Sequence, residues 1–254
     1  MKMTPPIYLI NLKKSPERLA KSKKRLAEQN IDFIRVEGVF GQDLSENEIK
    51  QYYCPALNVS KYHTALTKGQ IGCYLSHRKV WQLIAEGEDD FGIILEDDFV
   101  LPGNLNKAIE CIKNIDFSWD LIKLAAYQSR ERKIAFEQAL NDDFSIVVHA
   151  KPMSGGAATA LTKVAAKKLL AATNKFGRPC DTDIQNFWET NVSVLSLMPY
   201  CVSQDMAFES TISAKKEQRE KHFWRRKVQQ ISSSIKNANE VKKQIDDLKK
   251  QLKD

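Results

Sequence analysis

The chain has 254 residues, of which 43% are hydrophobic and 28% charged, so its composition is that of a soluble globular protein with one sizeable core. The net charge of +7 comes entirely from the last 40 residues, which hold 13 Lys/Arg against 6 Asp/Glu, while the other 214 residues carry 26 of each sign. A neutral body argues against nucleic acid as a partner and leaves the C-terminal segment as the candidate for an anionic one.

The sequence also shows no membrane span and no signal peptide. No apolar run approaches the ~20 residues of a membrane span, and the apolar run Ile7–Ile10 is too short for a signal peptide. The five cysteines are an odd number without a CxxC pair, which indicates reduced thiols in a cytoplasmic protein and argues against a zinc site.

The first 40 residues predict a strand, a helix and a second strand, which is the start of a parallel α/β sheet. Residues 7–10 and 33–36 are the apolar runs of the two strands. Between them, Ser15 is a favourable N-cap and Pro16 suits the first helical position. The polar stretch 43–68 that follows is the candidate for a mobile loop near a site.

Further strands and helices alternate along the rest of the body. Apolar residues from Ile71 to Ile84 recur at helical spacing, and the small Gly72 and Cys73 allow this helix to pack closely against a neighbour. Residues 127–143 are polar without a clear period. The other expected helices lie at 15–29, 45–52, 104–114, 163–172 and through 187–188, and the other strands at 93–95, 119–124, 144–149 and 192–197.

Three carboxylates, Glu96, Asp97 and Asp98, directly follow the apolar run Ile93–Leu95. Such a run indicates a strand buried on both faces, and ligands of open α/β sheets bind at the carboxyl ends of their strands. In an extended chain Glu96 and Asp98 point to one side and Asp97 to the other. Two carboxylates on one side suit a divalent metal that holds phosphate, while an acidic loop after a core strand explains the same residues without a site.

The C-terminal segment 213–254 differs from the body, 1–212, in its charge and in a heptad-like apolar seam. Basic residues gather near its start, between Lys221 and Lys227. Three interpretations are open: a coiled coil that makes a homo-oligomer, a basic amphipathic helix on an anionic membrane surface, or a helix packed on its own domain.

Several segments of the body resemble one known family when their order and spacing are taken together. They are Tyr8–Arg18, Gly69–His77, Ile94–Asp98, and Gly155–Thr162 with the loop Pro179–Asp181. The combination is similar to the bacterial family 25 glycosyltransferases, the lipopolysaccharide and lipooligosaccharide β-galactosyltransferase-like enzymes, which are related to collagen glycosyltransferases. The resemblance covers about residues 7–205 and leaves out the tail.

The resemblance implies a GT-A type fold, with a Rossmann-like, mostly parallel sheet flanked by helices, and a nucleotide-sugar donor, usually UDP-galactose. It also implies a divalent cation, usually Mn²⁺ and otherwise Mg²⁺, and inversion at the transferred sugar carbon. A divalent cation neutralises the charge that develops on a nucleoside diphosphate leaving group. An acidic triplet at the end of a buried strand agrees with these implications.

The acidic triplet resembles the family's metal-binding motif, so Asp98 is the first expected metal ligand and Glu96 the second. Gln204 or Asp205, after the last strand, is a third candidate ligand, and few protein ligands are needed where phosphates also hold the cation. The residues expected to bind the donor are Asn11, Arg18, Ser76, His77, Glu96, Asp97, Gly155 and Gly156.

An inverting transfer needs one general base on the acceptor hydroxyl. The resemblance places the loop 179–183 near the acceptor, so Asp181 is the first candidate base and Asp183 the second, although Asp181 also suits the N-cap of the next helix. Ser76 and His77 face different ways on their helix, so a donor-positioning or packing role is expected for them rather than nucleophilic catalysis.

The leading hypothesis is an inverting, metal-dependent hexosyltransferase, β-1,4-galactosyltransferase-like, that moves galactose from UDP-galactose to a sugar hydroxyl of a lipooligosaccharide or lipopolysaccharide acceptor. It implies a cytoplasmic enzyme that is peripheral on the inner face of the inner membrane if the tail binds lipid. The alternatives are a non-catalytic nucleotide-sugar-binding scaffold recruited through its basic tail, and a UDP-sugar hydrolase.

Overall fold

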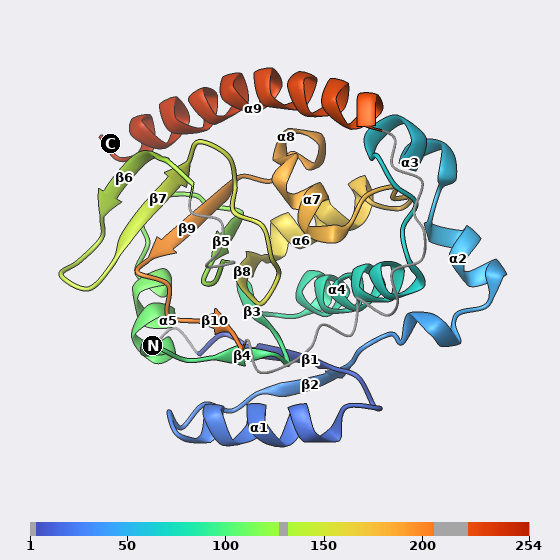
Figure 1. Ribbon diagram of the computed structural model, residues 1–254. Helices are drawn as coiled ribbons and strands as arrows, with labels where there is room; N and C mark the ends of the chain where they lie inside the picture. The colour runs from blue at the N-terminus through green and yellow to red at the C-terminus, as the bar shows by residue number, and fades with distance from the viewer. Residues whose placement is uncertain (1–3, 127–131, 206–222, 254) are drawn as a thin grey trace.

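The computed structural model describes residues 4–126, 132–205 and 223–253, and for residues 223–232 it describes the backbone alone. Within these residues the centre is a sheet of eight strands in the order β2-β1-β3-β8-β5-β9-β7-β6, with β10 and β4 forming a separate pair (Figure 1). The strands are β1 (Ile7–Asn11), β2 (Ile34–Glu37), β3 (Phe91–Glu96), β4 (Phe99–Val100), β5 (Leu121–Lys123), β6 (Ile134–Ala139), β7 (Ser145–His149), β8 (Ala158–Thr162), β9 (Val194–Met198) and β10 (Ser203–Gln204). The helices are α1 (Pro16–Ala27), α2 (Glu46–Tyr52), α3 (Pro55–Lys61), α4 (Lys68–Glu86), α5 (Leu105–Lys113), α6 (Lys163–Ala172), α7 (Cys180–Gln185), α8 (Phe187–Thr190) and α9 (Phe223–Gln251), with a short 3₁₀ turn at Gly41–Asp43.

Six of the eight strands in the described sheet run in the same direction. β2, β1 and β3 are parallel neighbours, β5 and β9 are parallel to each other, and β6 shares their direction. β8 runs the other way and joins the two parallel blocks by pairing with both β3 and β5, and β7 is the second antiparallel strand. The α/β, GT-A type architecture with a mostly parallel sheet is therefore confirmed.

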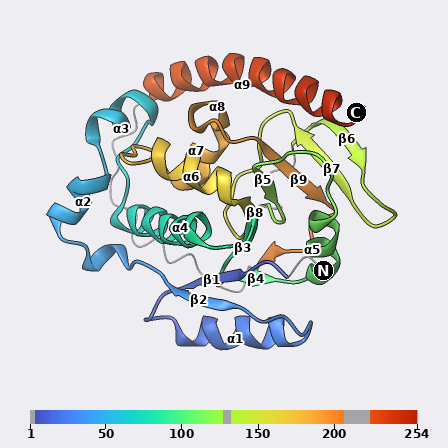
Figure 2. The same ribbon diagram turned by 180° about the vertical axis from the view of Figure 1, so that it is seen from behind.

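Helices flank the sheet on both sides. At the β2-β1 end, α1 and α4 lie on opposite sides of the strands (Figures 1 and 2). α4 begins with a capping box in which Thr67 and Gln70 each accept a hydrogen bond from the other's backbone N–H. It buries Tyr74 and Trp81 in the core. A Cβ at Gly72 would lie 2.5 Å from a backbone carbonyl oxygen, which confirms the close approach expected of this helix.

Several elements lie where the sequence pattern predicted none. β8 has the sequence Ala-Thr-Ala-Leu-Thr, whose small residues give no strand signal, but β3 and β5 pair with it on both edges. β6 is an edge strand with little burial, so it has no apolar run. α3 begins with Pro55 inside the stretch expected to be irregular. Pairing and packing with distant segments stabilise these elements, so local sequence does not reveal them.

The C-terminal helix α9 packs on the body, which is the third of the interpretations left open by the sequence. Asn237, Val241 and Leu248 form its buried face, whereas Ile235 of the heptad-like seam is 64% exposed. The Gln244 amide exchanges hydrogen bonds with the backbone of β9. The coiled-coil and membrane interpretations therefore gain no support from this face, and the expected start of the tail, 213–222, lies outside the described residues.

Over the ranges that the structure describes, no helix combines the length and the apolar character that crossing a membrane requires.

Candidate active site

The acidic triplet lies at the carboxyl end of β3, beside the ends of β1 and β10. Glu96 is the last residue of β3, and Asp97 and Asp98 form the turn into β4. The parallel register of β1 and β3 pairs Ile10 with Glu96, so the end of β1 reaches the triplet. β10 pairs antiparallel with β4 and brings Gln204 to the same corner. We call Glu96, Asp97, Asp98 and Gln204 the acidic corner.

Asp97 is held from the side of β1 and α1. Its carboxylate accepts hydrogen bonds from Asn11 Nδ2 at 2.7 Å and from Arg18 at 3.0 Å, and the Ser22 hydroxyl donates to its backbone carbonyl. Asn11 is 1% exposed, and its amide oxygen accepts from Arg35 at 3.1 Å. Asn11 therefore positions Asp97 from the end of β1.

Asp98 is buried with one oxygen available. Its Oδ2 accepts from the Gln204 amide at 3.1 Å, and its backbone carbonyl accepts from the Asp205 N–H at 2.6 Å. Its Oδ1 is also buried and has no hydrogen-bond partner among the residues described. Burial, together with the nearby Glu96 carboxylate, raises the pKa of Asp98 to about 6. An unpartnered buried carboxylate oxygen beside another carboxylate is a position that a cation stabilises.

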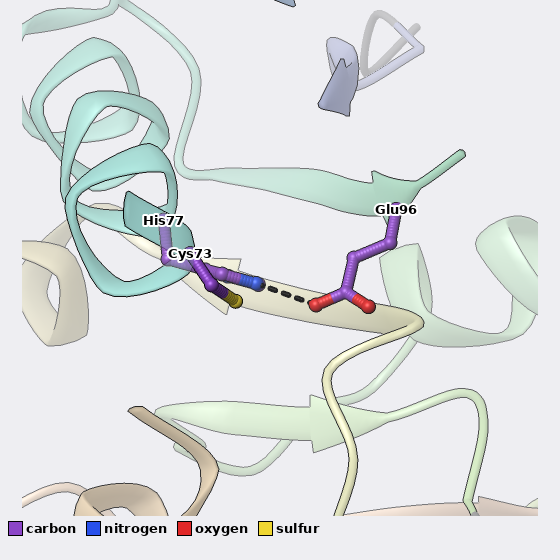
Figure 3. Close-up of side chains that lie close together, drawn as sticks. All are labelled: Cys73, His77 and Glu96. Carbon is purple, nitrogen blue, oxygen red and sulfur yellow. Dashed lines mark hydrogen bonds and ion pairs between the residues drawn. The ribbon is translucent and has the colours of Figure 1, made fainter. Parts of the chain in front are cut away.

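Glu96 points toward α4, where it meets His77 (Figure 3). Its Oε1 lies 2.8 Å from His77 Nε2. Burial raises the pKa of Glu96, but the hydrogen bond and charge of His77, helped by Lys123 and Arg18, outweigh this, so the pKa lies below its usual value. A Cβ at Gly156 would lie 2.6 Å from the same oxygen, so glycine at this position allows the Glu96 carboxylate to pack against the backbone.

The acidic corner fits a divalent cation of the kind that holds a diphosphate. The unpartnered oxygen of Asp98 and the ionised Glu96 supply hard oxygen donors, and Gln204 lies beside Asp98. These are the three residues that the sequence suggested as metal ligands: Gln204 contacts Asp98, and Glu96 is close enough to Asp98 to raise its pKa. The Asp97 carboxylate points to the other side of the chain, where it accepts hydrogen bonds from Asn11 and Arg18.

A buried lysine connects the acidic corner to the second acidic loop. Lys123, the last residue of β5, is 0% exposed, and its ammonium donates to the carbonyl oxygen of Gly155. The Gly155 N–H in turn donates to Asp181 at 3.4 Å. Burial lowers the pKa of Lys123 to about 8, although Asp181 and Glu96 favour its charged form. Lys123 thus binds the backbone carbonyl of Gly155, and Asp181 binds its backbone N–H.

The two candidate bases have different surroundings. Asp183 is buried, accepts from Arg178 Nε at 2.7 Å and from the Tyr74 hydroxyl at 2.8 Å, and Arg178 also binds Glu189. Asp181 is half-buried, and it accepts long hydrogen bonds, at 3.4 Å, from the Gly155 N–H and from the Thr182 hydroxyl. Asp183 is therefore committed to holding the fold, and Asp181 is the carboxylate available to a ligand.

The remaining expected donor-binding residue, Ser76, is a packing residue. Its hydroxyl donates to the Gly72 carbonyl at 2.7 Å and accepts from the Val39 N–H at 2.8 Å, and it is 3% exposed. It ties α4 to the loop after β2, which is the packing role weighed for it from the sequence. His77, one residue later, turns to the acidic corner instead.

The family is decided by comparison with known proteins. The model of glycosyltransferase family 25, described as a lipopolysaccharide biosynthesis protein, matches residues 4–184. The chain belongs to glycosyltransferase family 25. The match includes the acidic triplet, α4 and both candidate bases, while Gln204 and α9 lie beyond it.

Relatives of this family 25 chain include both active and inactive proteins. It is 33% identical over 125 residues to procollagen galactosyltransferase 1-B of Xenopus laevis and 32% identical over 128 residues to procollagen galactosyltransferase 2 of Homo sapiens, each match covering 46% of this chain and 20% of the relative. It is also 29% identical over 140 residues to the inactive glycosyltransferase 25 family member 3 of Mus musculus, over 52% of this chain and 24% of that one. The chain thus spans about a fifth to a quarter of the length of these relatives.

Among solved structures, the apo form of the glycosyltransferase GlyE from Streptococcus pneumoniae overlaps with a TM-score of 0.43 at 11% identity, covering 94% of this chain and 63% of that chain.

Sequence reasoning missed three residues of this region. Lys123 is the lone charge in the apolar strand Leu-Ile-Lys-Leu, a signal for a buried cation with a partner. Cys73 precedes His77 by four residues on α4, a spacing that places both side chains on one face. Arg178 lies just before the second acidic loop, and only the fold shows that it neutralises Asp183 and Glu189.

Proposed function

We propose that this family 25 chain transfers galactose from UDP-galactose to a hydroxyl group of a sugar acceptor, with inversion and with a divalent cation. The observation that carries the proposal is the buried Asp98 oxygen without a partner among the described residues, at the end of a sheet strand and next to Glu96. The names of the procollagen galactosyltransferases support galactose as the sugar. The finer specificity, β-1,4 transfer, belongs to the same proposal.

Asp98, Glu96 and Gln204 are the residues that would hold Mn²⁺ or Mg²⁺. When bound, the cation supplies charge neutralisation for the diphosphate leaving group. The protein's own contribution is position: Asn11 and Arg18 fix Asp97 and thereby the turn that carries Asp98. His77 fixes Glu96 from the opposite side, and Gly156 lets the Glu96 carboxylate pack close to the backbone.

Asp181 is the base that we assign to the acceptor hydroxyl. It lies within electrostatic reach of Lys123 and, through Gly155, beside the loop that borders Glu96. A base here takes the proton of the acceptor hydroxyl as that oxygen attacks the sugar carbon, and inversion requires only one such group.

The acceptor that we propose is a lipopolysaccharide or lipooligosaccharide sugar, as the family description suggests. The relatives named for procollagen point to a different acceptor, a sugar-accepting residue of a protein. Because this chain covers only 20% of their length, the first acceptor class is preferred for it.

The test is release of UDP from UDP-galactose by the purified chain, with Mn²⁺ and a panel of sugar acceptors. We expect Asp98→Ala to abolish Mn²⁺-dependent UDP binding, and Asp181→Ala to lower kcat by about 10²–10⁴-fold while UDP still binds. The exposed Asp142→Ala is the matched control and should behave as the wild type. Unchanged turnover in Asp98→Ala would contradict the assigned site.

A non-catalytic role is the second candidate, because relatives of this chain include proteins named as inactive. It predicts UDP binding without transfer to any acceptor and no effect of Asp181→Ala. A UDP-sugar hydrolase would release UDP at the same rate with and without an acceptor. The same acceptor panel therefore separates all three functions.

A further inference from the structure

A thiol, an imidazole and a carboxylate meet on the inner side of α4. Cys73 and His77 lie one helical turn apart on α4, and Glu96 reaches them from the end of β3 (Figure 3). One ligand atom from each residue, the Cys73 Sγ, a His77 ring nitrogen and a Glu96 oxygen, lies within 4.8 Å of the other two. His77 Nε2 and Glu96 Oε1 are the closest pair, at 2.8 Å.

These separations are close to those that a tetrahedral metal ion requires. Bond lengths of about 2.0–2.3 Å place neighbouring ligand atoms roughly 3.3–3.6 Å apart. The His77–Glu96 pair reaches that spacing if its hydrogen bond opens, and the Cys73 thiol already lies within 4.8 Å of both partner atoms. All three side chains come from regular elements, α4 and β3, which hold their backbones in place.

The surroundings of the cluster carry negative charge and pack closely. Burial raises the pKa of Cys73 well above its usual value, and the Glu96, Asp181 and Asp98 carboxylates raise it further. The same carboxylates attract a cation, which would release the thiol proton to solvent on binding. Gly156 borders the cluster, and a Cβ there would lie 3.2 Å from the His77 ring.

We propose that Cys73, His77 and Glu96 form a binding site for Zn²⁺. The ligands are the Cys73 thiolate, His77 Nε2 and a Glu96 oxygen, and the fourth position remains for water or a ligand oxygen. A sulfur and a nitrogen ligand favour zinc, whereas Mn²⁺ and Mg²⁺ prefer the all-oxygen donors of Asp98, Glu96 and Gln204. The sequence lacks the CxxC pairs that are typical of zinc sites, but this site uses one cysteine together with a histidine and a glutamate.

Glu96 belongs to both metal sites, so the two sites compete. Zn²⁺ on Cys73 and His77 draws Glu96 away from the oxygen ligands, and it therefore weakens the binding of Mn²⁺ and UDP. This consequence rests on the proposed function. Zinc binding itself does not, because it is measured without donor, acceptor or turnover.

The experiment uses Co²⁺ as a spectroscopic probe on metal-stripped, reduced protein. We expect one equivalent of Co²⁺ to give a thiolate-to-cobalt charge-transfer band, and one equivalent of Zn²⁺ to remove it. Cys73→Ser should lose the band, and the matched variant Cys54→Ser, which changes another half-buried free cysteine, should keep it. A large excess of Mg²⁺ should leave the band in place.

The proposal is overturned if the wild type gives no such band, if the band survives in Cys73→Ser, or if it disappears in Cys54→Ser. Circular dichroism of each variant shows whether it is folded. His77→Gln provides a second test, since it retains the thiol and should weaken Co²⁺ binding measurably. A cobalt band in a protein that fails to bind UDP with Mn²⁺ would refute the proposed function and leave the zinc site intact.

Discussion

At the scale of single residues, the site depends on charges that are buried yet compensated. Asp97 is neutralised by Arg18, Glu96 meets His77, and Asp183 meets Arg178. Among the residues that the structure describes, Lys123 donates to a carbonyl oxygen, and the Asp181 and Glu96 carboxylates favour its charge from a longer distance. Burying an ammonium group without an ion-pair partner in contact costs folding free energy, and the hydrogen bond that positions Gly155 is the structural role that accounts for Lys123.

Replacing Lys123 should change the pH dependence of stability. Its folded-state pKa of about 8 is below the usual value, so between pH 8 and pH 10 the unfolded chain binds more protons than the folded one. The contribution of Lys123 to the free energy of unfolding should then rise with pH, by up to about 1.4 kcal/mol per unit. We expect the stability of the wild type minus that of Lys123→Met to increase over this range in urea titrations. A difference that is constant with pH would contradict the lowered pKa.

At the scale of elements, the short helix α7 presents its two acids to different surroundings. Residues two apart on an α-helix lie on nearly opposite sides. Asp183 therefore turns inward to Arg178 and Tyr74, while Asp181 turns to Gly155 and the acidic corner. One helical turn supplies both a structural ion pair and the candidate base.

This division predicts opposite effects of two similar substitutions. Asp183→Asn leaves the Arg178 charge buried with Glu189 as its remaining partner, so unfolding should become easier by about 3–5 kcal/mol. Asp181→Asn should change stability by less than about 1 kcal/mol and should abolish most transfer activity. Thermal unfolding and initial rates of UDP release measure the two effects. If Asp181→Asn destabilised as much as Asp183→Asn, Asp181 would be a structural residue like its neighbour.

At the scale of the whole molecule, α9 closes one side of the body. A groove of about 1070 Å³ is lined by residues of α9 and by residues around β5 and α8. The Asn237 amide donates to the Ala150 carbonyl, and the Gln251 side chain accepts from the Ser118 N–H. The described half of the basic segment is therefore part of the domain's packing.

Core and surface positions on α9 should respond differently to truncation. Leu248 is 3% exposed against the body, so Leu248→Ala should lower the free energy of unfolding by about 2–4 kcal/mol. Ile235 is 64% exposed, and Ile235→Ala should change it by less than about 0.5 kcal/mol. Urea unfolding at two protein concentrations measures both. A helix that packed only in an oligomer would show a concentration-dependent loss for Leu248→Ala.

The sequence by itself determined the βαβ start, the long helix α4 and the position of the acidic triplet. These rest on local signals: an apolar run ended by three carboxylates, and apolar residues at helical spacing from Ile71 to Ile84. Family 25 membership also follows from linear motifs, which the family match confirms.

Only the tertiary structure decided which of those residues share a site. The antiparallel insertion of β8 brings Gly155 and Gly156 beside Glu96, and the β4–β10 pair brings Gln204 to Asp98. It also assigned Asp183 and Ser76 to the fold, and joined Cys73 to Glu96. The physical reason is that burial and partner choice depend on contacts between residues distant in the chain, which local propensity does not encode.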